Sequence, residues 1–149
     1  MTEVILTTVL TVISGVFIFV IGQLIVKVFV EPIHKLRGLK GDIIGFLTYY
    51  SDVYLSLPDL NKDEDVSKVS TEARKLGSDL MARALTVPCY RFFSVLGAVP
   101  KFRDVTIAHR ELIGLSNTVL AKSDSVPERA TKRLESIKSS LHLPKELLA

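Results

Sequence analysis

The sequence contains one cysteine and no tryptophan, and its three histidines lie far apart in the chain. A single thiol, Cys89, cannot form an intramolecular disulfide, which suits a reducing compartment. No second histidine or cysteine lies three or four residues from His34, His109 or His142, so no zinc site of ordinary spacing can be written. The sequence therefore predicts no metal centre and no cofactor.

Catalytic motifs are also incomplete. The run from Gly114 to Asn117 begins like a nucleophile elbow but lacks its closing glycine and a preceding strand, so its polar side chains should bond locally or across helices. The run from Arg37 to Asp42 lacks the Gly-Lys-Ser/Thr order of a phosphate loop. The run from His109 to Glu111 is expected to form a solvated polar patch. We expect no enzyme, and no small-molecule substrate is evident.

The charge balance is small, with a net charge of +3. Nucleic-acid binding lacks both the charge and the aromatic interleaving that it would need. The last helix has a basic side, which should be solvated or make a weak contact with anionic lipid.

Charge is missing altogether between Val4 and Val26. At about 1.5 Å per helical residue, this run can cross a hydrocarbon core of roughly 30 Å, so the sequence predicts a transmembrane helix. Residues 1–3 contain no Lys or Arg, so the basic region of a cleavable signal peptide is missing, and we expect a retained anchor.

The orientation of the span follows from its flanking charges. Lys27, Lys35, Arg37 and Lys40 follow it, whereas only Glu3 precedes it. Because Lys and Arg are enriched on the cytoplasmic side, we expect the N-terminus outside and the C-terminal domain in the cytoplasm of a cell with an inner (plasma) membrane.

Small residues mark one face of the span, namely Thr8, Thr11, Gly15 and Gly22. Such a face lets transmembrane helices approach closely and self-associate. Threonine and glycine are also common in spans in general, and the sequence leaves both interpretations open.

A polar ridge begins at the inner end of the span. Gln23, Lys27, Glu31 and Lys35 are successive i, i+4 neighbours, which a continuous α-helix stacks in one row. The ridge indicates either an anchor at the membrane interface or a polar seam that faces partner helices. The anchor is favoured, because Lys27 and Glu31 can pair within one helix. Pro32 should kink the helix or restart it.

No segment alternates with a period of two, and apolar residues recur at spacings of three and four. We expect helices over about 32–57, 66–86 and 104–121, the third of these with Asp104 as its N-cap. A short aromatic helix after Pro88 should turn Tyr90, Phe92, Phe93 and Leu96 inward, and the last helix should start with a capping box at Ser125. Three glycines of the second helix, Gly38, Gly41 and Gly45, suggest close packing against another helix. The predicted fold class is all-α: one N-terminal transmembrane helix (residues 1–31) followed by a small cytosolic helical bundle (residues 32–149).

Several short strings run through the chain: Gly22-Gln23, Glu31-Pro32-Ile33, Tyr49-Tyr50, Val99-Pro100, and the run from Glu111 to Asn117. With these strings the chain resembles a group of small bacterial single-span membrane proteins with a cytosolic helical domain. The resemblance implies an inner-membrane location and implies no reaction, ligand or site.

Two functional hypotheses remain. The first is a membrane-anchored, non-enzymatic helical interaction or scaffold module that binds a protein partner or a second copy of itself. The alternative is an oligomeric membrane effector, pore-forming or membrane-perturbing, of the toxin or cell-defence type. In either case the partners are the lipid bilayer and protein, and the candidate association residues are Thr8, Thr11, Gly15, Gly22, Gln23, Lys27 and Glu31.

Overall fold

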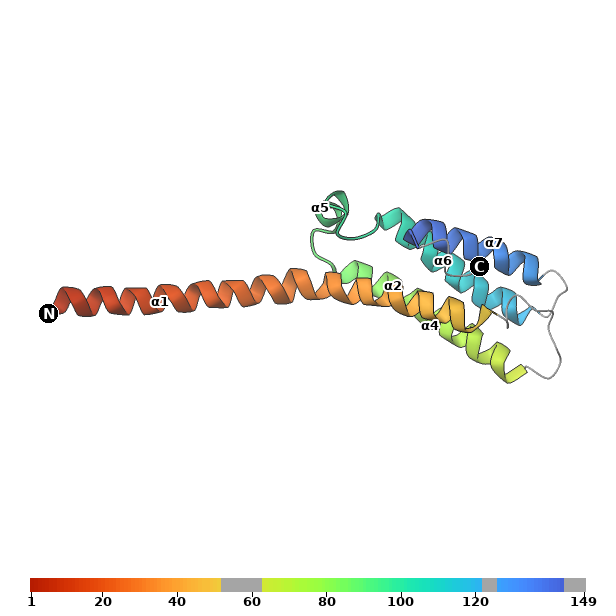
Figure 1. The fold of residues 1–149 in the computed structure, drawn as a ribbon, viewed down its shortest axis with the longest axis horizontal. Coiled ribbons are helices and arrows are strands. Elements are labelled where there is room, and N and C mark those ends of the chain that lie inside the picture. The colour runs from red at the N-terminus through yellow and green to blue at the C-terminus, as the bar shows by residue number, and fades with distance from the viewer. Residues whose placement is uncertain (52–62, 122–125, 144–149) are drawn as a thin grey trace.

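A computed structural model of the chain describes residues 1–51, 63–121 and 126–143, and these residues form an all-α structure. A long helical rod runs into a packed helical domain (Figure 1). The rod consists of α1 (Thr2–Ile25), the π-helical turn η1 (Val26–Val30) and α2 (Glu31–Tyr49). The domain adds α4 (Asp63–Thr86), α5 (Tyr90–Val95), α6 (Phe102–Leu120) and α7 (Val126–Leu141). The predicted fold class is confirmed.

Pro32 explains the π-helical turn. Proline has no N–H to donate to the carbonyl four residues earlier, which disturbs a regular α-helix. Here the N–H of Glu31 donates to the carbonyl of Val26, five residues back, and Pro32 lies in the first turn of α2. The rod thus stays helical through the proline, because the wider π-helical turn accommodates the missing hydrogen bond.

The core lies among α2, α4, α6 and α7: α6 packs against both α4 and α7, and α2 packs along α4 (Figure 1). The apolar faces that the spacing predicts are buried in α2, α4, α6 and α7. They include Leu36, Leu39, Ile43 and Leu47 of α2, Val69, Ala73, Leu80 and Ala84 of α4, Val105, Ala108, Leu112 and Leu115 of α6, and Ala130, Leu134, Ile137 and Leu141 of α7. Burial of these side chains holds the domain together.

Some predicted boundaries and caps differ from the structure. Helix α2 ends at Tyr49, earlier than expected, and residues 52–57 lie outside the described residues. Helix α4 begins three residues earlier than predicted, at Asp63. The cap residue of α6 is Lys101, with extended backbone, so the predicted N-cap Asp104 instead lies in the first turn. The predicted capping residue Ser125 lies outside the described residues.

The short aromatic helix α5 is oriented differently from the prediction. Tyr90 and Phe93 pack against the core, as expected. Phe92 and Leu96, expected to point inward, are 61% and 63% exposed. Six residues make fewer than two helical turns, so one face of α5 can reach the core while the other remains in solvent.

The expected close packing of the glycine face on α2 is wrong within the described chain. A Cβ atom built on Gly38, Gly41 or Gly45 would meet no described atom within 4 Å. Helix α2 packs through the opposite face, which carries the large aliphatic side chains.

Candidate functional site

Helix α1 exposes every one of its side chains. Its candidate association face, Thr8, Thr11, Gly15 and Gly22, covers an arc of about 60° at roughly 100° of rotation per residue. No described atom lies within 4 Å of a Cβ built on Gly15 or Gly22. The face is therefore narrow and fully open, and its role in association stays a prediction.

The hydroxyl groups on α1 bond to the helix itself. Thr8 Oγ1 donates to the Val4 carbonyl at 2.8 Å, and Thr11 Oγ1 donates to the Thr7 carbonyl at 2.8 Å. A hydroxyl that already has an acceptor in its own helix gains little from a second helix. Thr8 and Thr11 thus offer small surface for close approach rather than unmet hydrogen bonds.

The polar ridge is split by η1. Gln23 belongs to α1, Lys27 to η1 and Glu31 to α2. The wider π-helical turn changes the rotation between Lys27 and Glu31, so they are not stacked as in a continuous α-helix. Glu31 pairs instead with Lys35, with Oε2 and Nζ at 3.6 Å. Both side chains are about half exposed or more, so this pair contributes little to stability.

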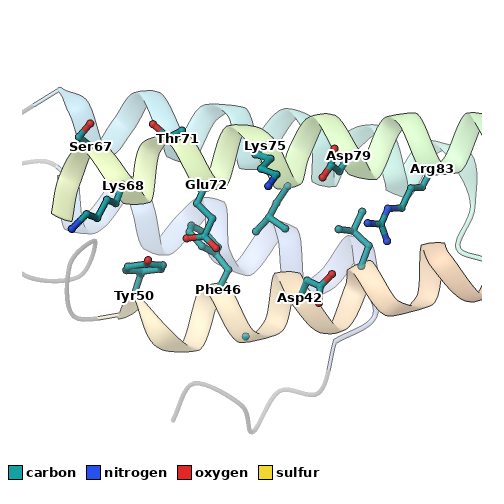
Figure 2. Close-up of a pocket in the computed structure, with 13 residues that line it drawn as sticks. Asp42, Phe46, Tyr50, Ser67, Lys68, Thr71, Glu72, Lys75, Asp79 and Arg83 are labelled. Carbon is teal, nitrogen blue, oxygen red and sulfur yellow. The ribbon is translucent and has the colours of Figure 1, made fainter. Parts of the chain in front are cut away.

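A second exposed feature is a groove of about 790 Å³ between α2 and α4. Figure 2 shows the groove with α2 along one side and α4 along the other. Leu39, Phe46 and Leu76 form its floor, and they are almost fully buried in the core. Charged residues of both signs line the rest: Asp42, Lys68, Glu72, Lys75, Asp79 and Arg83. The groove therefore offers a partner mainly charged side chains of both signs, three acidic and three basic.

Electrostatic contacts order both ends of this groove. Glu72 extends from α4 toward Tyr50, the residue that follows α2 (Figure 2). Lys68 Nζ instead pairs with Glu64 Oε1 of its own helix at 2.9 Å. Desolvation, and then the hydrogen bond and charge of Glu72, raise the pKa of the Tyr50 phenol. At the other end, Arg83 Nη1 donates to the Lys35 carbonyl at 2.8 Å and ties α4 to α2. These contacts fix the walls and leave the glycine side of α2 open.

Polar side chains also join α4 to α6. Ser116 Oγ lies 3.1 Å from Ser70 Oγ, and Arg74 donates to Asn117 Oδ1 at 2.9 Å. Ser116 and Asn117 thus bond across helices, one of the two predicted outcomes. All of these groups join helices of the domain to one another.

The predicted solvated patch from His109 to Glu111 is only partly exposed. His109 Nδ1 donates to the Gly77 carbonyl at 2.9 Å, and Glu111 Oε2 accepts from Arg133 Nη1 at 2.8 Å. Both side chains are half-buried, whereas Arg110 is exposed. The prediction was wrong for His109 and Glu111, because tertiary contacts between helices use them.

Within the described residues, no group of three or more His, Cys, Asp or Glu side chains could hold a metal ion. Comparison with family models, with curated proteins and with solved structures finds no match to this chain. Function must therefore be argued from α1 and from the groove.

Sequence reasoning missed the groove, although a signal for it exists. Lys68, Glu72, Lys75 and Asp79 repeat at spacings of four and three on α4. Such a row is normally solvated, and only the position of α2 makes it a wall of the groove.

Proposed function

We propose that the protein is a membrane-anchored, non-enzymatic helical interaction module with a cytoplasmic domain. One observation carries the proposal: a helix long and apolar enough to span a membrane is fully exposed and runs without interruption into a packed helical domain. An exposed apolar surface of this size is stable only in contact with lipid or with other apolar helices. The charges after α1 favour the orientation with the domain in the cytoplasm.

Two features support retention of α1 as an anchor rather than its removal as a leader. The helix continues through η1 into α2, and the Phe29 ring of η1 packs against the Phe93 ring of α5 with centroids 6.0 Å apart. The end of the apolar segment is thus an integral part of the domain.

The interaction surface of this module is the α2–α4 groove with the adjoining glycine side of α2. Gly45 lines the groove, so the two surfaces are continuous. A partner helix could approach the α2 backbone closely there, because no described side chain covers it.

Topology and surface are tested together in a bacterial host. A reporter that is active only in the cytoplasm, fused after Ala149, should work, and its periplasmic counterpart should not. For the surface, Gly41→Cys and the control Lys132→Cys are compared in a Cys89→Ser background, because Lys132 is exposed on α7. Cross-linking at residue 41 alone supports the module. Equal cross-linking at both residues, or none, would contradict docking of a second copy on this side.

The alternative, an oligomeric membrane effector, draws support from the small face of α1 and from the polar Gln23 near its inner end. Expression at high level separates the two functions. Rapid depolarisation of the membrane, abolished by Gln23→Leu, would favour the effector. A harmless membrane-bound protein would favour the module.

A further inference from the structure

After η1, most of the exposed large apolar side chains lie in one short stretch of the chain. Among the described residues after η1, seven large apolar side chains are exposed, and five of them lie in residues 85–102. They are Leu85, Phe92, Val95, Leu96 and Phe102. Val95 is 88% exposed, more than any of the others. Such a cluster on a small domain marks a contact surface.

This apolar region is well ordered by its own contacts. The Tyr90 hydroxyl donates to the Pro100 carbonyl at 2.9 Å, and the Ala98 N–H donates to the Phe93 carbonyl at 2.9 Å. The Tyr90 and Phe102 rings meet edge to face with centroids 5.5 Å apart. Helix α5 therefore presents Phe92, Val95 and Leu96 from a fixed support.

Two contacts place α5 at the end of the apolar helix. Its Phe93 ring packs on Phe29 of η1, and Arg37 Nε of α2 donates to the Ala98 carbonyl at 3.1 Å. Figure 1 shows α5 beside the junction of α1 and α2, at the end of the domain nearest α1. The exposed apolar side chains of α5 are thus close to the level at which the span leaves the hydrocarbon core.

Positive charge prevails in the sequence around α5, and one carboxylate, that of Asp104, acts on Tyr90. Residues 80–103 contain Arg83, Arg91, Lys101 and Arg103 and neither Asp nor Glu. Apolar side chains surrounded by Lys and Arg are typical of segments that lie in the interface of an anionic leaflet.

We propose that α5 is a second membrane contact, in which Phe92, Val95 and Leu96 enter the interfacial layer of the leaflet from which α1 emerges. Arg91, Lys101 and Arg103 then meet anionic headgroups. The inference rests on the proposed function, since it requires α1 to span the bilayer. Its consequence is mechanical, because a contact beside the span fixes the rotation of the domain about α1.

The absence of tryptophan from the chain makes a clean test possible. Three full-length variants, Phe17→Trp, Phe92→Trp and Leu120→Trp, are reconstituted in vesicles of phosphatidylcholine and phosphatidylglycerol. Lipids brominated either near the headgroup or deep in the acyl chain then quench the single tryptophan by contact. Leu120 is the control, because it ends α6 at the far end of the domain (Figure 1).

The inference expects deep quenching for Phe17→Trp, shallow quenching with blue-shifted emission for Phe92→Trp, and no quenching for Leu120→Trp. If Phe17→Trp is not quenched, the proposed anchor itself fails. If Phe17→Trp is quenched but Phe92→Trp behaves like Leu120→Trp, the anchor stands and the second contact is refuted. Protection of Phe92→Trp from aqueous iodide without lipid quenching would also refute it and would indicate a protein partner. Val95→Trp provides a second probe at a fully accessible position.

The charges are tested in the Phe92→Trp background. In anionic vesicles, replacement of Arg91, Lys101 and Arg103 by glutamine should lower the ratio of inserted to free α5 by about fivefold per charge removed. Removal of Arg129, Lys132 and Lys138 from α7 deletes the same charge and should have no effect. Equal effects of the two sets would contradict a local contact with anionic lipid.

Discussion

The open glycine side of α2 makes a prediction about stability that can be worked out from the structure. We consider the triple variant Gly38→Ala, Gly41→Ala and Gly45→Ala. In the described chain, an added methyl group at each position meets nothing within 4 Å. All three residues lie inside a regular helix, so alanine keeps the backbone conformation.

The expected effect is stabilisation. Glycine in a helix interior costs about 0.8–1 kcal/mol relative to alanine, mainly because the unfolded glycine has more conformational freedom. Three independent replacements should raise the free energy of unfolding by about 2–3 kcal/mol. For a domain of about 100 residues, this corresponds to a rise in Tm of roughly 10–20 °C.

The assay is thermal unfolding of the full chain in a mild non-ionic detergent, followed by circular dichroism at low protein concentration. Gly77→Ala is the matched control, because Gly77 lies in the α4–α6 contact. Its added Cβ would lie 3.2 Å from Leu112 Cβ and 3.3 Å from Ile113 Cδ1. Overpacking of this kind costs about 1–3 kcal/mol, which should cancel or exceed the gain in helix propensity.

A triple variant with an unchanged or lower Tm would refute this reasoning, since it would mean that the glycine side of α2 is covered in the folded chain. Two of these substitutions, Gly38→Ala and Gly45→Ala, also report on function when they are combined with Gly41→Cys. If a second helix packs on these glycines in membranes, cross-linking from Gly41→Cys should fall when Gly38 and Gly45 become alanine, although the domain is more stable.

Three further predictions concern the domain. Ser70→Ala or Ser116→Ala alone should destabilise it by about 1 kcal/mol. The double variant should cost less than the sum of the two, because the second change removes the hydroxyl that the first left unpaired. Urea unfolding of the two single variants and the double variant measures this double-mutant cycle. Desolvation, and then a neighbouring carboxylate, raise the pKa of Tyr90 to about 12. Because the folded state holds this proton more tightly, the contribution of Tyr90 to the free energy of unfolding is complete below about pH 10 and falls as the pH rises toward about 12. In thermal unfolding at alkaline pH, Tyr90→Phe should remove this fall in stability. Glu111→Gln should cost about 1 kcal/mol or less, because its pair with Arg133 is partly exposed, and the cost should shrink in high salt.

The sequence was most informative where one periodicity decides the structure. Leu112 and Leu115 of α6, or Leu134 and Ile137 of α7, are buried as predicted, because residues three and four apart share one face of a helix. The apolar run of α1 was equally clear, because its length exceeds that of an ordinary core helix. These features depend only on local spacing.

Features that depend on the neighbouring helix were not predictable. His109 bonds to the Gly77 carbonyl because α4 and α6 approach closely at that glycine, and nothing local to His109 indicates this. Likewise, Phe92 is exposed and Phe93 is not because the second ring meets Phe29, far away in sequence. The groove arises from where α2 lies against α4, and both of its walls look like ordinary solvated helix faces.

The continuity of the rod connects these surfaces. Because α1 passes through η1 into α2 without a flexible joint, the direction of the span also sets the direction of α2 (Figure 1). A single helix would still allow the domain to rotate about the helix axis, and a second contact at α5 removes that freedom. The α2–α4 groove then runs along the axis of the span and faces one fixed direction. Under the proposed function, a helix bound in it would continue the line of another membrane-spanning helix, and we therefore propose a second anchored chain as its occupant.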